Sequence, residues 1–174
     1  MKHSLPVLSI LAVFALTACT QSAPPSSVVK PAAKVDPANA VNAIRAAGVG
    51  LDSAVQVHPL RDPAIDGFLK KANEAETRNE FAAAIESANK ALKLAPDAPE
   101  ILQTLAELET ARGNWQQADQ WAMKSFDLGP KIGSLCARNW QTVVEARTAL
   151  GDAASAAQAA VRVKDCRVPP RLRM

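Results

Sequence analysis

Small, large and turn-forming residues recur at an interval of 34 residues between Ile65 and Pro130. Each copy contains two alanines, an aromatic residue and a proline, in the pairs Ala72 and Ala106, Phe81 and Trp115, Ala84 and Ala118, and Pro96 and Pro130. Small residues let two helix backbones approach closely, the aromatic residue fills the space beside them, and the proline ends the second helix. The pattern therefore predicts two helix–turn–helix units, with Asn79 and Gly113 in their turns.

A third, altered unit follows the first two. Gly151-Asp152 repeats the turn at Gly113-Asn114 but lies four residues later than the interval requires. The extra residues fit in the turn-rich segment 129–134. Counted from Gly151, the inward positions are Trp140, Val144, Ala156 and Ala160. We expect one domain over 62–168, with units at about 63–96, 97–130 and 135–168.

The interval and its alanine, aromatic and proline positions resemble the tetratricopeptide repeat family over residues 63–168. The resemblance implies an all-α fold, a short solenoid of three antiparallel helix pairs. In that family the first helices of successive units line a concave groove that binds a partner.

Carried over by position, the resemblance predicts a polar groove lining with three carboxylates, which suits a segment bearing amides or positive charge. The lining residues are Leu69, Asn73, Glu76, Gln103, Glu107, Thr110, Arg138, Gln141 and Glu145. Some members of the family hold a terminal carboxylate in a clamp. Here Asn73 and Arg138 match clamp positions, whereas Leu69 replaces a lysine and Thr104 an asparagine. The alternative for each lining residue is ordinary solvated helix surface.

The start of the chain has the order of a secretory signal. A basic head at Lys2 and His3 precedes the apolar run Leu5–Leu16, which is too short to span a bilayer as a helix. The following Leu-Thr-Ala-Cys19 resembles the lipobox of bacterial lipoproteins, which implies a signal peptide over 1–18 and a lipid on Cys19. The alternative is an ordinary secretory peptide with a coincidental cysteine. Thr20 stands where an aspartate would favour the inner membrane, so we expect anchoring to the outer membrane, facing the periplasm.

Two segments separate the anchor from the repeats. Residues 19–40 are rich in Ser, Pro and Ala and predict a disordered tether. Residues 41–61 predict a partly ordered segment, with one or two helical turns over 41–47 ended by Gly48 and Gly50. We expect this segment to lie along the first unit and to cover part of its apolar end.

Two cysteines, Cys136 and Cys166, remain after Cys19. Cys136 falls at the start of the third unit's first helix and Cys166 at the end of its second, and these ends are neighbours in an antiparallel hairpin. An even pair in an oxidising compartment predicts a disulfide. The alternative is a pair of reduced thiols.

Residues suited to catalysis are scarce. Without the signal peptide the chain has one histidine, His58, and no glycine-rich phosphate loop after a strand. We therefore expect no metal, no cofactor and no enzyme activity. The net charge is +3, but the C-terminal end is more strongly basic, with Arg162, Lys164, Arg167, Arg171 and Arg173 against Asp165. That end is either a solvated tail or a contact for an acidic partner or anionic lipid. An exported chain is not expected to bind nucleic acid.

These features predict a membrane-anchored adaptor or assembly factor that binds another envelope protein through the groove. The alternative is a self-associating structural lipoprotein whose terminal helices mediate homodimerisation.

Overall fold

The computed structural model describes residues 34–51 and 62–167. Within these ranges the fold is all-α, as the sequence predicted. Seven helices follow one another: α1 (Pro37–Ala47), α2 (Pro63–Thr77), α3 (Phe81–Leu94), α4 (Pro99–Ala111), α5 (Trp115–Leu128), α6 (Ser134–Ala149) and α7 (Ala153–Asp165). None of the described helices has the length and apolarity that a membrane span requires.

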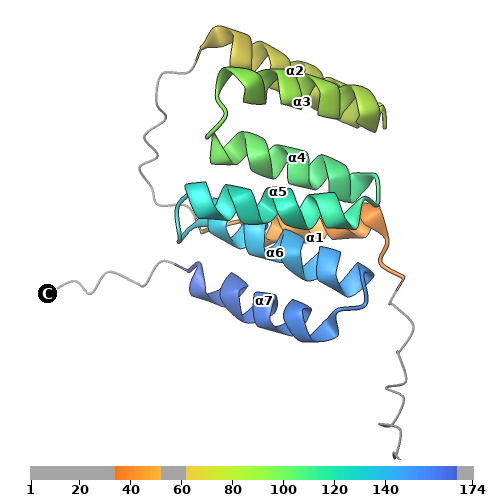
Figure 1. Cartoon of the computed structure of the whole chain (residues 1–174), viewed down its shortest axis with the longest axis vertical. Coiled ribbons are helices and arrows are strands. Elements are labelled where there is room, and N and C mark those ends of the chain that lie inside the picture. The colour runs from red at the N-terminus through yellow and green to blue at the C-terminus, as the bar shows by residue number, and fades with distance from the viewer. Residues whose placement is uncertain (1–33, 52–61, 168–174) are drawn as a thin grey trace, which may run out of the picture.

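Helices α2 to α7 form three consecutive pairs, α2 with α3, α4 with α5 and α6 with α7. Contacts of α3 with α4 and of α5 with α6 join the pairs into one stack (Figure 1). Helix α1 departs from this order. It is the first described helix in the chain, yet it packs against α4 and α6, the first helices of the second and third pairs.

The turn inside each pair has the same geometry. Asn79, Gly113 and Gly151 adopt positive φ angles of 58°, 74° and 81°. The N–H of the residue after each of them donates over 2.9 Å to a carbonyl in the last turn of the first helix, in the bonds Glu80 to Ala75, Asn114 to Glu109 and Asp152 to Arg147. This bond and the left-handed residue together end the first helix. The shared turn places Gly151 in the position predicted for it, although the interval before it is longer.

Alanine dominates the core of the stack. The predicted close-approach residues Ala72, Ala84, Ala106 and Ala118 are all buried. In the third pair Trp140 and Val144 are partly buried against the core, and Ala156 is buried. The inward partner of Ala156 is Ala159 rather than the predicted Ala160, which stays partly exposed. Within the described residues no further helix pair covers the outer side of α7, so fewer of its residues are enclosed.

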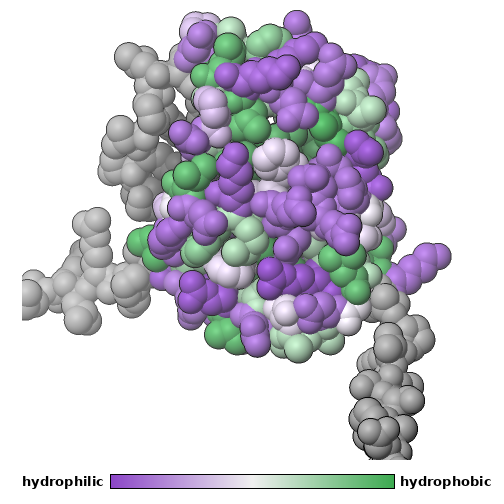
Figure 2. Space-filling model, in the orientation of Figure 1, coloured by the Kyte–Doolittle hydropathy of each residue, from purple (hydrophilic) through white to green (hydrophobic). Residues whose placement is uncertain are grey.

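The outer surface of the stack is mixed in polarity. Figure 2 shows one face of the molecule, on which hydrophilic residues surround hydrophobic ones that form small, separate patches. Apolar residues of this kind are normal on a folded protein, so a binding surface has to be identified from its shape and charge as well.

The region before the repeats differs from its prediction. The predicted tether over 19–40 is wrong at its end, because α1 already begins at Pro37, with the Asp36 side chain accepting from the Asn39 N–H over 2.9 Å. Helix α1 also lies on α4 and α6, not along the first unit. Its buried face is Ala40, Val41 and Ile44, a spacing that places all three on one side of a helix.

Several predictions concern residues outside the described ranges. These are the signal peptide over 1–18, the lipid on Cys19, the segment 52–61 and the basic tail over 169–174.

Candidate functional site

The predicted groove face is formed by α2, α4 and α6, and α1 covers part of it. Helix α1 packs across α4 and α6. Three of the predicted lining residues, Gln103, Glu107 and Thr110, are buried. The Thr110 hydroxyl donates to the Ala106 carbonyl and Gln103 Nε2 donates to Glu107 and Thr142, whereas Gln103 Oε1 is buried with no hydrogen-bond partner among the described residues. The prediction that they line an open groove is wrong for Gln103 and Thr110.

Glu107 is the centre of a charged network on this face. Arg45 Nε of α1 donates to one carboxylate oxygen over 2.9 Å, and Arg138 Nε of α6 donates to the other over 2.8 Å. Gln103 Nε2 also donates to the second oxygen, over 3.0 Å. The carboxylate of a 4% exposed side chain thus has two cationic partners, which offsets the cost of burying it.

Arg45 joins three helices through this network. Its Nη2 also lies 2.6 Å from the Glu76 carboxylate of α2. Burial opposes the charge of Arg45, but hydrogen bonds to Glu107 and Glu76 and their negative charges outweigh it and raise the pKa of Arg45. Arg45 was not among the site residues predicted from the sequence. The available signal was the Asp36-Pro37 helix start followed by three apolar residues on one face, which predicts a helix that docks.

The part of the face that α1 leaves open is a pocket of about 310 Å³, which we call the α2–α4 pocket. Apolar side chains from α2 and α4 and the two arginines line it together: Arg45, Leu69, Ala72, Asn73, Glu76, Thr104, Glu107, Leu108 and Arg138. All four positions compared with the carboxylate clamp, Leu69, Asn73, Thr104 and Arg138, lie in this one pocket.

The remaining two predicted lining residues lie apart from the α2–α4 pocket. Gln141 Nε2 donates to Glu145 Oε1 over 2.7 Å on α6. Gln141 contributes to a different hollow, beside α1 and α7.

The charge of the α2–α4 pocket also differs from the prediction. Glu76 and Glu107 were expected to attract a positively charged segment, but each is already paired with arginine. What the pocket offers a ligand is an apolar surface of leucine and alanine, the amide of Asn73, and the guanidinium groups of Arg45 and Arg138.

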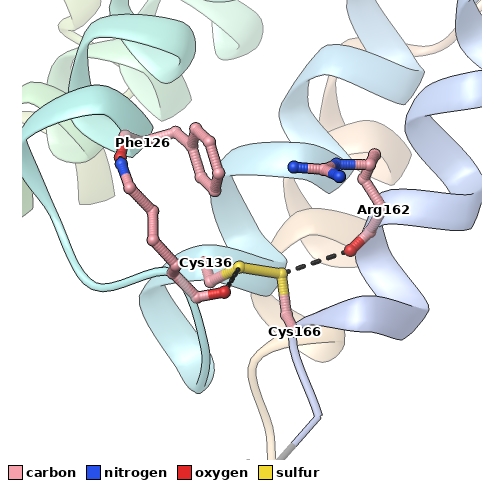
Figure 3. The surroundings of a disulfide bond; sticks show 5 residues. Phe126, Cys136, Arg162 and Cys166 are labelled. Carbon is pink, nitrogen blue, oxygen red and sulfur yellow. Dashed lines mark hydrogen bonds between the residues drawn. A yellow bond between two sulfur atoms is a disulfide. The ribbon is translucent and has the colours of Figure 1, made fainter.

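The predicted disulfide is present. Cys136 and Cys166 are bonded, with their Cα atoms 5.6 Å apart (Figure 3). Both are buried, and each sulfur lies against a backbone carbonyl oxygen, 3.0 Å from that of Lys131 and 3.3 Å from that of Arg162. The bond ties the beginning of α6 to the residue that follows α7.

Aromatic and basic side chains surround the disulfide. The rings of Phe126 and Trp140 meet edge to face, with centroids 4.9 Å apart. Lys131 Nζ lies 4.2 Å from the Phe126 centroid, and the Arg162 guanidinium lies 5.2 Å from that of Trp140. The Phe126–Trp140 contact joins α5 to α6, and the Arg162–Trp140 contact joins α7 to α6.

Comparison with known proteins gives a structural likeness. No protein-family model matches the chain, and no curated protein matches it. Among solved structures, the globular C-terminal domain of P. aeruginosa LpoP is similar, with a TM-score of 0.57 and 28% sequence identity. The likeness covers 60% of this chain and 99% of that one. The covered part of this chain is about as long as the run from α2 to α7. It is shorter than the run from α1 to α7.

Proposed function

We propose that this chain is a lipid-anchored interaction protein of the bacterial envelope, an adaptor or assembly factor. Its six stacked helices α2 to α7 act as a short tetratricopeptide-type array, and a partner binds in the α2–α4 pocket. Cys19 carries the lipid, and the residues before α1 connect the anchor to the folded part. The chain has no catalytic role of its own in this proposal.

The observation that carries the proposal is the open pocket beside the part of the face that α1 covers. Leu69 and Leu108 give it an apolar surface, while Asn73, Thr104 and the two arginines add hydrogen-bonding groups. Such a mixture suits a short peptide segment with one apolar side chain and nearby carbonyl or carboxylate oxygens. A pocket of about 310 Å³ has room for a segment of this size and not for a folded domain.

The likeness to LpoP supports the bacterial setting and the domain order. The similar part of LpoP is its globular C-terminal domain, and it is matched along nearly its whole length. In this chain α2 to α7 likewise follow a long N-terminal stretch, which begins with the predicted signal and lipid anchor. A partner within the envelope is therefore the first kind to test.

The test is capture of partners from cross-linked envelopes by the lipidated protein, compared with the variant Leu69→Glu. This variant places a charge on the apolar surface of the pocket and should remove the partner. The matched control is Val161→Glu, which makes the same kind of change at a 57% exposed position on α7. Equal recovery of one partner by all three proteins would exclude the α2–α4 pocket. Binding of the purified partner to the same three proteins then tests whether the contact is direct.

Self-association is the second candidate. The exposed apolar residues Leu150 and Val161 lie on the last helix pair, where a second copy could cover them. Sedimentation of the chain lacking residues 1–19 separates the two candidates. A monomer favours the adaptor, whereas a dimer that Val161→Glu dissociates favours self-association.

A further inference from the structure

Helices α1 and α7 enclose a second hollow, separate from the α2–α4 pocket, which we call the α1–α7 groove. Its volume is about 490 Å³. Helix α1 and the residues after it supply one wall, α7 and Arg167 the other, and α6 contributes a single residue. The lining is Ala43, Ala46, Ala47, Val49, Gly50, Leu51, Gln141, Val163, Lys164 and Arg167. None of these residues lines the α2–α4 pocket.

The lining of the groove combines small apolar side chains with polar and basic ones. Three alanines of α1 and Val163 of α7 provide small apolar side chains. Val49, at the α1 end, is 79% exposed, more than any other large hydrophobic residue in the described ranges. A small apolar hollow with an exposed valine beside it is a surface on which another chain can bury apolar side chains.

The charged residues of the groove all have the same sign. Lys164 and Arg167 line it, and no acidic side chain does. Other arginines on this side of the molecule are neutralised, Arg45 and Arg138 by Glu107. Within 34–51 and 62–167, neither Lys164 nor Arg167 lies within ion-pair distance of a carboxylate. The positive charge is therefore available to an anionic ligand.

The flanking segments of the same chain do not match this charge. Lys30 and Lys34 precede α1, and Arg171 and Arg173 follow α7. Like charges would oppose binding of either segment beside Lys164 and Arg167. Residues 52–61, which follow Leu51, contain Asp52 and Arg61 and so have no net charge. An occupant with a net negative charge must therefore come from another molecule.

We infer that the α1–α7 groove docks a short apolar and acidic segment of a partner protein. Apolar side chains of the segment pack on Ala43, Ala46 and Val163, and its carboxylates meet Lys164 and Arg167. An anionic membrane would meet the same cations, but a flat lipid surface would not follow the hollow down to the half-buried Ala43, Ala47 and Val163. A peptide fills both parts of the groove, which is why a protein segment is the occupant that the surface favours.

The test is binding of the full chain to an array of synthetic twelve-residue peptides that combine Ala and Leu with Glu, Gln or Lys. Peptides with Leu next to Glu should bind, and their Gln and Lys counterparts should bind more weakly. Lys164→Glu should weaken binding of the acidic peptides by about tenfold or more, because a like charge then faces them. The matched control Lys93→Glu, at an exposed position on α3, should change binding by less than about twofold.

A second variant tests the apolar part of the groove. Ala46→Trp fills the hollow from α1 and should also weaken binding by about tenfold, whereas Ala157→Trp on exposed α7 surface should not. Equal binding of Glu, Gln and Lys peptides, no peptide binding, or equal binding by Lys164→Glu would overturn the inference. Lys164-dependent binding to vesicles of phosphatidylglycerol and phosphatidylethanolamine, without peptide binding, would assign the surface to the membrane instead. Leu69→Glu changes the α2–α4 pocket and should leave binding of the acidic peptides unchanged. Loss of peptide binding to the α1–α7 groove can therefore be distinguished from loss of partner binding to the α2–α4 pocket.

Discussion

Arg45 and Glu107 lie 62 positions apart in the chain, and their side chains meet in an ion pair of 2.9 Å. The same guanidinium group reaches Glu76 on a third helix. Helix α1 is therefore held to the stack both by its apolar face and by a charged contact with two helices.

Glu107→Gln should destabilise the protein more than Glu76→Gln. The Glu107 side chain is 4% exposed and serves two arginines, whereas that of Glu76 is 17% exposed and serves one. Removing the buried charge leaves Arg45 and Arg138 without their shared partner, and we expect a loss of about 2–3 kcal/mol. Loss of the more exposed Arg45–Glu76 pair in Glu76→Gln should lower the free energy of unfolding by about 1 kcal/mol or less. Urea melts of both variants measure the difference. Equal midpoints would show that the Glu107 network contributes no more than a surface pair.

Two glycine-to-alanine changes should act in opposite directions. Gly113 has a φ of 74°, so an alanine there is forced into the left-handed region at a cost of about 1–2 kcal/mol. Gly67 lies inside α2, and a methyl group there would meet nothing within 4 Å. Gly67→Ala should stabilise the protein by about 0.5–1 kcal/mol. Thermal melts of the two variants beside the unchanged protein measure both effects. If both variants raised or both lowered the melting temperature, the left-handed turn assigned to Gly113 would be contradicted.

Reduction of the disulfide should loosen the last helix pair first. Cys136 and Cys166 are 30 residues apart, and closing a loop of that size contributes about 2–4 kcal/mol. Among the described helices, α7 packs on α6 and has no pair beyond it, so loss of the bond should raise hydrogen exchange between Ala153 and Lys164 before it rises in α2 to α5. Exchange resolved by segment, with and without reductant, measures this. Uniform change in all helices would indicate one cooperative unit instead.

Added volume at the close-approach alanines should be costly. Ala118→Leu should destabilise by about 1–3 kcal/mol, because the helices have no room for the larger side chain. The repeat pattern alone marks Ala118 as more sensitive than Ala122. The structure buries both completely, and so we expect Ala122→Leu to be comparably harmful. Ala157→Leu, on the exposed side of α7, is the control and should leave the urea midpoint nearly unchanged.

The start of α7 should depend on pH through Asp152. Its side chain accepts from the Ser155 N–H over 3.0 Å, and hydrogen bonds from Ser155 hold the pKa of Asp152 below its ordinary value. The folded-state pKa is thus lower than the unfolded one, so the stabilisation is present at neutral pH and is lost as pH falls through the folded-state value. The stability difference between the protein and Asp152→Ala should shrink in acid. Asp97→Ala is the control, because the helix after it begins without a side-chain cap. A difference that stays constant with pH would rule out the charged cap.

The sequence predicts the stack well because each of its parts carries a local signal. The turn at Gly113 requires a left-handed residue, Pro63 and Pro99 begin helices, and the alanines recur at the close-approach positions. Likewise the disulfide follows once the third hairpin is in place, because its two ends must be adjacent.

The position of α1 has no such signal. Helix α1 has no counterpart at the repeat interval, and its own pattern of Val41 and Ile44 indicates that it docks but not where. Its place depends on Arg45 finding Glu76 and Glu107, two acidic residues that the repeat pattern assigns to an open groove. The repeat pattern therefore assigns Gln103 and Thr110 of α4 to a binding surface, although both side chains are buried.

The order in which the chain is made has a consequence for α1. Helix α1 is completed first, but one of its two docking helices, α6, follows about ninety residues later, after Gly133. Until then α1 has no complete surface to occupy, and the side chains it will cover on α4 remain open. A chain truncated before α6 would therefore carry α1 without its full docking surface.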